Sequence, residues 1–208
     1  MHPHPVTEKF CMKLYFKIYK PYGMLSQFTP EGNNKSLADL DYAFPRDVYP
    51  VGRLDADSEG LLILTNDTRV NSLLLDPTRK HLRTYLVQVE GNFSTEAAMK
   101  LESGVTISVA GKKYITKPCK VRRLTHIPDL PDRNPPVRYR KTVSDSWIEI
   151  SLAEGKNRQV RKMTAACGFP TLRLVRIKIE ELSLESMQPC EVKQIPASDF
   201  FKKTKIHA

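Results

Sequence analysis

The sequence predicts an α+β fold in which a few helices flank a mixed, largely antiparallel sheet. Many short segments have the alternating or continuously apolar pattern of strands, few have helical spacing, and the two kinds do not alternate as in βαβ units. The chain has 208 residues, 40% of them hydrophobic, so it can form one large domain or two small lobes. No Gly-rich phosphate loop follows a predicted strand, and nothing supports a nucleotide cofactor.

In the first half of the chain, alternation and turn residues define the elements. Strands are predicted at residues 13–19, whose apolar side chains Leu14, Phe16 and Ile18 share one face, and at residues 61–64, a continuous apolar run. Such a run between turn residues is typical of a strand buried on both faces. Ser36 and Asp67 are candidate N-caps of two short helices.

In the second half, helices are predicted at residues 94–103, closed by Gly104, and from the candidate cap Asn157 to Cys167. In the last strand Val175, Ile177 and Ile179 are expected on the face opposite Arg176 and Lys178. The strands predicted here are 84–90, 105–109, 114–123, 147–152 and 172–179.

The domain organisation predicted from these elements has three parts. Residues 1–12, with His-Pro-His-Pro, form an N-terminal arm, and residues 13–188 form the globular region, with lobes at about 13–80 and 81–188. Residues 189–208 have little pattern and form a C-terminal tail. Phe200 and Phe201 are expected to anchor this tail to the globular region.

Charge points to a polyanionic partner. The 33 Lys and Arg against 23 Asp and Glu give 33 − 23 = +10, with a pI of about 9.5, so nucleic acid is favoured over an anionic membrane. No apolar stretch approaches the roughly 20 residues that span a bilayer, and a soluble cytoplasmic monomer is expected. Residues 127–137 are a proline-rich surface loop, and the basic side chains in and after it fit either RNA contact or simple solvation; they are Arg133, Arg138, Arg140 and Lys141.

Cysteine and histidine spacing predicts no metal site. The four cysteines form no CxxC pair and are expected to be free thiols. The five histidines also lack ligand spacing.

Residues 52–67 place clustered carboxylates directly before the apolar run at 61–64. Asp55 follows Arg53 in a loop that the adjoining strand holds rigidly, and such a position can aim a carboxylate at a substrate. An acidic surface turn with an ion pair is the alternative.

Residues 154–163 form a second informative stretch. Arg158, Arg161 and Lys162 project together from the start of the helix that Asn157 would cap. Positive charge there interacts unfavourably with the helix dipole, by tenths of a kcal/mol per charge. Two interpretations stay open: the charges bind a ligand, or they are simply solvated.

Three motifs resemble those of the RsuA/RluB/RluE/RluF family of pseudouridine synthases. They are Gly-Arg-Leu-Asp with Ser-Glu-Gly-Leu-Leu-Ile-Leu-Thr-Asn-Asp in residues 52–67, Tyr-Leu-Val-Gln-Val-Glu-Gly in 85–91, and Glu-Gly-Lys-Asn-Arg-Gln-Val-Arg-Lys-Met in 154–163. Each motif alone is moderately specific for the family, and the three together, in this order, are strong evidence of membership. Flanking phrases at 20–29, 133–136 and 168–174 look most like the E branch of the family.

Two departures from the family pattern stand out. Most relatives carry an N-terminal S4 RNA-binding domain, whereas the first strand here begins near Lys13; the E branch also lacks that domain. Thr68 stands where relatives often have glycine, and Arg83 where many have lysine. Neither substitution is expected to abolish chemistry.

The resemblance implies the pseudouridine synthase catalytic fold without an S4 domain. It also implies isomerisation of one uridine in large-subunit (23S) ribosomal RNA to pseudouridine, without cofactor or metal. Asp55 matches the catalytic aspartate and would act as the nucleophile or deprotonate the sugar. Arg161 would pair with Asp55 and keep it ionised, and Tyr85 would stack on the extruded uracil.

RNA contacts are expected from five polar residues of the first and third motifs. Arg53 would support the flipped nucleotide or position a phosphate, and the others would contact the backbone. These other residues are Lys156, Asn157, Arg158 and Lys162.

Two other functions fit parts of the sequence. A noncatalytic RNA-binding or ribosome-assembly protein would use the same basic surfaces. A Mg²⁺-dependent nuclease would use the carboxylates of Asp55, Asp57 and Glu59, because hard cations favour clustered oxygens.

Overall fold

A computed structural model of the chain describes residues 12–138 and 143–207. Residues 1–11 of the predicted N-terminal arm, and Arg140 and Lys141 of the basic loop, lie outside the described residues. The strands are β1 (Tyr15–Lys20), β2 (Tyr49–Val51), β3 (Glu59–Thr65), β4 (Arg83–Glu90), β5 (Thr106–Val109), β6 (Lys112–Ile115), β7 (Lys120–Arg123), β8 (Asp145–Leu152), β9 (Thr171–Ile179), β10 (Leu182–Ser183) and β11 (Val192–Ile195). The helices are the 3₁₀ helix η1 (Leu37–Asp39), α1 (Thr68–Leu75), α2 (Thr95–Ser103), α3 (Gln159–Ala166) and α4 (Ala197–Thr204).

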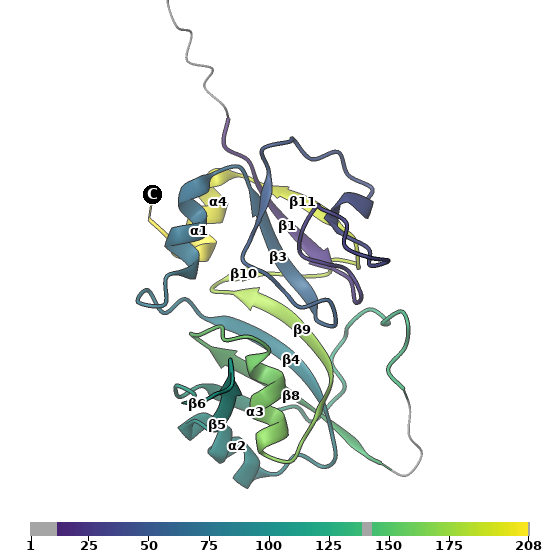
Figure 1. Cartoon of the computed structure of the whole chain (residues 1–208), viewed down its shortest axis with the longest axis vertical. Coiled ribbons are helices and arrows are strands. Elements are labelled where there is room, and N and C mark those ends of the chain that lie inside the picture. The colour runs from purple at the N-terminus through teal and green to yellow at the C-terminus, as the bar shows by residue number, and fades with distance from the viewer. Residues whose placement is uncertain (1–11, 139–142, 208) are drawn as a thin grey trace, which may run out of the picture.

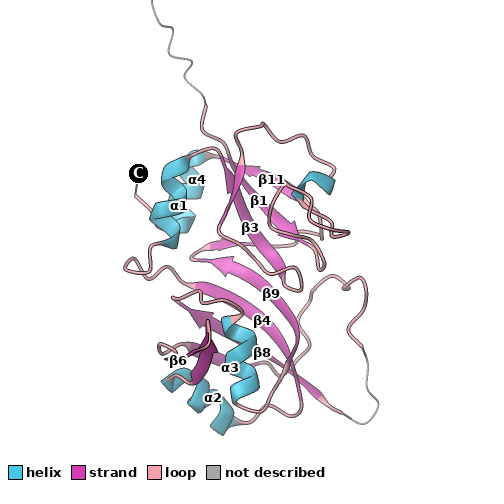
Figure 2. Cartoon of the chain, in the orientation of Figure 1, coloured by secondary structure: helices cyan, strands magenta, loops and turns pink. Residues whose placement is uncertain are grey.

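The predicted α+β fold with a mixed, largely antiparallel sheet is confirmed. Within the described residues, nine strands form one sheet in the order β11-β1-β3-β9-β4-β8-β7, with β2 beside β3 and β10 beside β9. Every pair is antiparallel except β3–β9, which runs parallel over two residue pairs, Glu59 with Val175 and Gly60 with Arg176. This short junction joins two halves of the molecule, which lie one above the other in Figures 1 and 2.

β1 and β3 are buried on both faces, as predicted for β3 but not for β1. Tyr15 and Tyr19 of β1 pack into one apolar cluster, and Phe16 and Ile18 pack into another on the opposite face. The second cluster exists because the segment with η1 and β2 folds back over the sheet. Sequence alternation in β1 therefore predicted the strand correctly but predicted one buried face where there are two.

The prediction of a patternless C-terminal tail was wrong. β11 pairs with β1 from Tyr15↔Ile195 to Ile18↔Val192, and α4 covers the same half of the sheet (Figure 1). Phe200 is fully buried and stacks on Tyr15, with ring centroids 4.5 Å apart. The C-terminal segment thus completes the core of the first half of the molecule, because it supplies the edge strand and an aromatic anchor.

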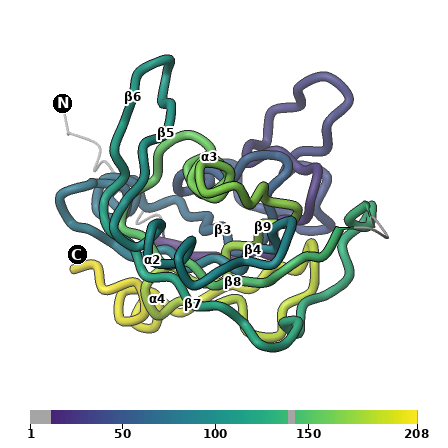
Figure 3. The backbone as a smooth tube through the Cα atoms, turned by 90° about the horizontal axis from the view of Figure 1, so that it is seen from below, coloured from purple at the N-terminus to yellow at the C-terminus, as the bar shows by residue number. Residues whose placement is uncertain are grey.

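The second half carries α2, α3 and the β5–β6 hairpin. The single strand predicted at residues 114–123 is instead two strands, β6 and β7, in different sheets. Lys117-Pro118 separates them, since proline cannot donate to a strand ladder. Figure 3 shows the hairpin and α3 projecting from the same side of the sheet.

The faces predicted for Lys178 and Ile179 on β9 were wrong, whereas Arg176 lies opposite Ile177 as predicted. Between Arg176 and Lys178 the pairing with β4 shifts register, leaving Ile177 as an extra residue. This β-bulge puts Arg176 and Ile179 on one side of the sheet, where Arg176 is buried, and leaves Lys178 exposed.

The proline-rich loop before β8 is held by one of its own basic residues. Arg133 donates hydrogen bonds to the carbonyl oxygens of Pro135 and Pro136, and its guanidinium lies 4.2 Å from the ring centroid of Tyr22. Arg133 therefore organises the loop instead of only being solvated. Across residues 12–138 and 143–207, no helix has the length and apolarity that crossing a bilayer would require.

We expect Gly60→Ala to weaken the junction strongly. Gly60 has φ +107°, and a Cβ there would overlap the backbone nitrogen and carbonyl of Arg176. Backbone strain and this overlap together should lower the free energy of unfolding by about 3 kcal/mol or more, as measured by urea denaturation.

Gly111→Ala is the matched control. Gly111 also has a positive φ, +77°, but a Cβ there would meet nothing within 4 Å, so the expected loss is only about 1 kcal/mol. Equal losses in the two variants would contradict a tight β3–β9 contact.

Candidate active site

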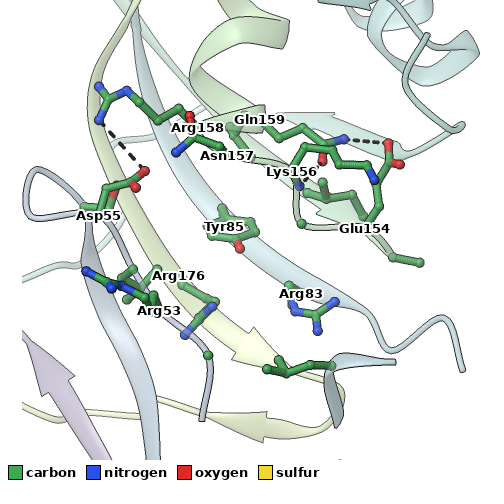
Figure 4. A pocket seen from close by; sticks show the side chains of 18 of the residues that line it. Arg53, Asp55, Arg83, Tyr85, Glu154, Lys156, Asn157, Arg158, Gln159 and Arg176 are labelled. Atoms are coloured by element: carbon green, nitrogen blue, oxygen red, sulfur yellow. Dashed lines mark hydrogen bonds and ion pairs between the residues drawn. The ribbon is translucent and has the colours of Figure 1, made fainter. Parts of the chain in front are cut away.

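A pocket of about 630 Å³ lies where the two halves of the molecule meet. One wall is the loop between β2 and β3, the floor is β4 and β9, and the other wall is the turn before α3 (Figure 4). Its polar lining includes Arg53, Asp55, Arg83, Tyr85, Tyr114, Lys117, Glu154, Lys156, Asn157, Arg158, Gln159 and Arg176. Residues predicted from the first, second and third motifs, far apart in the sequence, are thereby brought to one cavity.

The loop that carries Asp55 is fixed by hydrogen bonds from the turn after β1. The buried hydroxyl of Ser26 accepts from the Leu54 N–H at 3.0 Å and donates to the Leu54 carbonyl at 2.9 Å. The Gly23 N–H donates to the carbonyl of Ala56 at 2.7 Å. Asp55, between these two anchored residues, keeps a side chain that is 36% exposed to the pocket. A carboxylate held this way can meet a substrate without reorganisation of its backbone.

The structure does not have the predicted ion pair between Asp55 and Arg161, because Arg158 and Arg161 both pair with Asp57. Arg158 donates to both carboxylate oxygens of Asp57, at 3.0 and 2.7 Å, and Arg161 Nε lies 3.4 Å from Asp57 Oδ2. Burial works to raise the pKa of Asp57, but the hydrogen bond from Arg158 and the charges of both arginines lower it overall. The arginine nearest to Asp55 is Arg158, whose Nη1 is 3.9 Å from Asp55 Oδ2 (Figure 4).

Tyr85 lies in the centre of the pocket floor. It extends from β4 toward the cavity, between Asp55 on one side and the turn before α3 on the other (Figure 4). Of the five predicted RNA-binding residues, Arg53, Lys156, Asn157 and Arg158 line the pocket with exposed side chains. Lys162 is not in the lining; its Nζ lies 3.5 Å from Asn157 Oδ1.

Asn157 is not the N-cap of α3. The helix begins at Gln159, and the cap position is Arg158, which has the left-handed φ of +52° and makes no side-chain capping bond. Gln159 closes the turn instead: its Oε1 accepts from the Lys156 N–H at 2.8 Å. The turn is therefore held by the side chain that follows it, and Asn157 remains exposed at the pocket.

Glu154 is a site residue that the sequence did not single out. Its buried carboxylate accepts hydrogen bonds from Tyr114 Oη at 2.6 Å, from the Lys117 N–H at 2.8 Å and from Gln159 Nε2 at 2.5 Å. It thereby ties the β5–β6 hairpin to the turn before α3. Only its position at the start of the third motif could have indicated it.

Lys20 is a second residue that the sequence did not indicate. It is fully buried below the Asp55 loop and donates to the carbonyls of Met24 at 2.7 Å and Pro21 at 2.9 Å, with Ala56 O at 3.5 Å. Burial lowers its pKa to about 8, although the nearby charges of Glu59, Asp57 and Asp55 oppose that shift. A lysine ending an apolar strand before a Pro-x-Gly turn was the only signal.

The acidic cluster does not have the arrangement of a Mg²⁺ site. Asp57 is paired with two arginines, and Glu59 is buried in a bidentate ion pair with Arg173, with both distances 2.9 Å. These carboxylates therefore have cationic partners instead of a shared open site. Within the described residues, no group of three or more His, Cys, Asp or Glu side chains could hold a metal ion.

A comparison with protein families identifies the family of this chain. The family model described as RNA pseudouridylate synthase matches residues 15–166, which is most of the chain and includes Asp55, Tyr85 and Arg161. The chain belongs to the RNA pseudouridylate synthase family. It is thus an RNA-modifying enzyme, and the resemblance of its three motifs is confirmed.

Curated relatives of this synthase agree with the family. It is 49% identical to ribosomal large subunit pseudouridine synthase E of Xanthomonas campestris, over 82% of this chain and 89% of the relative. It is 46% identical to the protein of the same name from Vibrio parahaemolyticus, over 85% of this chain and 71% of the relative. It is 32% identical to ribosomal large subunit pseudouridine synthase B of Bacillus subtilis, over 88% of this chain and 68% of the relative.

Solved structures show the same fold. A crystal structure of a pseudouridylate synthase aligns with 93% of this chain and 74% of its own, at 24% identity and a TM-score of 0.74. The structure of human RNA pseudouridylate synthase domain containing 1 aligns over 99% of this chain and 98% of its own, at 15% identity and a TM-score of 0.52.

We expect Lys20→Met to change how stability depends on pH. Because the pKa of Lys20 falls from 10.5 in the unfolded chain to about 8 on folding, the unfolded state holds this proton more tightly. Lys20 therefore makes the free energy of unfolding rise between pH 8 and pH 10.5, by about 3 kcal/mol.

Denaturation of wild type and Lys20→Met at pH 7, 9 and 10 measures this effect. The stability difference in favour of the wild type should widen as pH rises, because the variant lacks the titrating group. A difference that stays constant from pH 7 to 10 would show that the ammonium is not destabilised by its burial.

Proposed function

We propose that this synthase isomerises one specific uridine in large-subunit ribosomal RNA to pseudouridine. The observation that carries the proposal is the half-exposed carboxylate of Asp55 beside Tyr85 in one pocket at the junction of the two halves. The substrate class is supported by the relatives, which are named for the large ribosomal subunit.

Asp55 is the proposed catalytic carboxylate. The reaction must detach uracil from C1′ of its ribose, turn it and rejoin it through C5. Asp55 would either attack C1′ or remove the proton from C2′, and both routes need an ionised carboxylate. Arg158 Nη1 lies 3.9 Å from Asp55 Oδ2, and Arg161 would act through Asp57, by holding the loop that carries Asp55.

Tyr85 would stack against the target uracil. Enzymes that act on a base extrude it from the stack into a pocket, and an aromatic side chain on the pocket floor offers the base a new stacking partner. The exposed side chains of Arg53, Lys156, Asn157 and Arg158 at the rim, and the half-buried Lys162 nearby, would contact the RNA backbone.

An isomerisation needs no external oxidant, reductant or group donor. We therefore propose that the enzyme acts without cofactor or metal, as a monomer, in the cytoplasm where its proposed substrate is found. A noncatalytic role in ribosome assembly is less well supported, because a binding surface alone does not require an anchored carboxylate inside a pocket.

The test is tritium release from large-subunit ribosomal RNA transcribed with uridine labelled at C5. Pseudouridine formation expels the C5 hydrogen, so the wild type should release tritium with and without a chelator. Asp55→Asn should release it at least about 1,000-fold more slowly, because the carboxylate acts in the chemical step itself.

Asp129→Asn, an exposed acidic position outside the pocket, is the control and should match the wild type. Both aspartate variants should bind the RNA like the wild type. Equal tritium release by Asp55→Asn and wild type would refute the role of Asp55. RNA binding without any release, on naked RNA and on assembled particles, would favour the noncatalytic function, and loss of activity with chelator would favour a metal enzyme.

A further inference from the structure

Arg176 occupies an unusual place on the pocket floor. Its side chain is only 5% exposed, and Nε donates to the carbonyl of Leu61 at 2.8 Å. Its Nη2 atom is buried and has no hydrogen-bond partner among the described residues. A buried donor without a partner costs free energy, so a group that binds there during the reaction would satisfy it.

The pairing of β9 with β4 directs this arginine into the pocket. Arg176 lies directly opposite Tyr85 in the β4–β9 ladder, and both side chains line the pocket (Figure 4). The β-bulge at Ile177 comes directly after Arg176 and brings Ile179 to the same side of the sheet.

Arg83 adds a second guanidinium to the same region. It lies two residues before Tyr85 on β4, and it donates to the carbonyls of Leu74 at 3.0 Å and His81 at 3.1 Å. In the described part of the chain, no carboxylate is within ion-pair distance of Arg83 or Arg176, unlike Arg158, Arg161 and Arg173. Two arginines without a counter-charge favour an electron-rich ligand between them and Tyr85.

The base of the target nucleotide fits this position better than a phosphate does. The phosphates of an extruded nucleotide stay connected to the RNA strand, so they must remain near the pocket rim, where the exposed cations lie. The base enters deepest. A base stacked on Tyr85 would bring its carbonyl edge toward Arg176 and Arg83.

We propose that Arg176, with Arg83 beside it, binds the carbonyl edge of the target uracil and stabilises the negative charge that the base acquires. This inference rests on the proposed function. When the C1′–N1 bond breaks, the bonding electron pair leaves with uracil, whether Asp55 attacks C1′ or removes the C2′ proton. The resulting charge is delocalised onto O2 and O4, which accept hydrogen bonds from a guanidinium. Uracil then rotates and C5 bonds to C1′. In the first route the Asp55 carboxylate leaves C1′ at this step, in the second Asp55 returns the proton to C2′, and in both the C5 proton is lost to solvent.

The experiment combines enzyme variants with substituted RNA. A synthetic segment of large-subunit RNA, containing the uridine mapped with the wild type, would carry uridine, 2-thiouridine or 4-thiouridine at that position. Single-turnover rate constants at saturating enzyme would be measured by nucleoside analysis for wild type, Arg176→Met, Arg176→Lys and Lys178→Met. Lys178→Met is the matched control, since Lys178 lies on the same strand but is exposed on the other side of the sheet.

With uridine, Arg176→Met should react about 100-fold or more slowly than wild type, Arg176→Lys should recover part of this loss, and Lys178→Met should stay within about threefold. Because sulfur accepts hydrogen bonds weakly, one of the two thio-substituted RNAs should slow the wild type about tenfold. The same RNA should not slow Arg176→Met further, since the donor is already gone. If Arg176→Met does not fold, the same coupling is measured with Arg176→Lys.

Three results would overturn the inference while leaving the proposed function intact. These are an Arg176→Met rate within threefold of wild type, a thio effect of equal size in wild type and variant, or an unchanged rate with weaker, salt-dependent RNA binding. The last would assign Arg176 to a phosphate. A wild-type protein inactive on all large-subunit RNA would instead overturn the proposed function, and this inference with it.

Discussion

The close approach of β3 and β9 at Gly60 and Arg176 is the constraint on which the site depends. The two strands share only two residue pairs, and glycine is needed because the backbone of Arg176 fills the space where a Cβ would be. The buried ion pair of Glu59 with Arg173 spans the same junction. Removing one partner of such a pair costs about 3–5 kcal/mol, because the other charge remains buried. This pair therefore fixes how β3 and β9 meet more than it adds stability.

The junction matters because the functional groups are divided between the two halves. Asp55 precedes β3 in the first half, whereas Tyr85, Arg158 and Arg161 belong to the second. Asp57 connects them, since its carboxylate and carbonyl accept hydrogen bonds from the two arginines of the α3 segment. Asp57 thus pairs with both arginines near the Asp55 loop and leaves the Asp55 side chain exposed to the pocket.

Positive charge is graded across the pocket. Exposed cations lie at the rim and are suited to the RNA backbone. Arg176 is buried in the pocket floor with the half-buried Arg83 beside it, and Lys20 is buried beneath the Asp55 loop. Burial lowers the pKa of both Lys20 and Arg83, which shows that their charges are costly in the unliganded protein. Such costly charges are typical of functional sites, where they become useful as negative charge develops in the reaction.

Local sequence alone determined much of this protein. The apolar run of β3, the capping of α1 by Asp67 and of α2 by Ser94, and Gly168 after α3 all follow from interactions within a few residues. The three motifs likewise identified the family and the loop of Asp55. The tertiary structure decided which arginine meets which carboxylate, the bulge that exchanges the faces of Lys178 and Ile179, and the place of the C-terminal segment in the core. Each of these depends on contacts between strands distant in sequence, where one extra residue reverses the face of a side chain. No local pattern encodes such a shift.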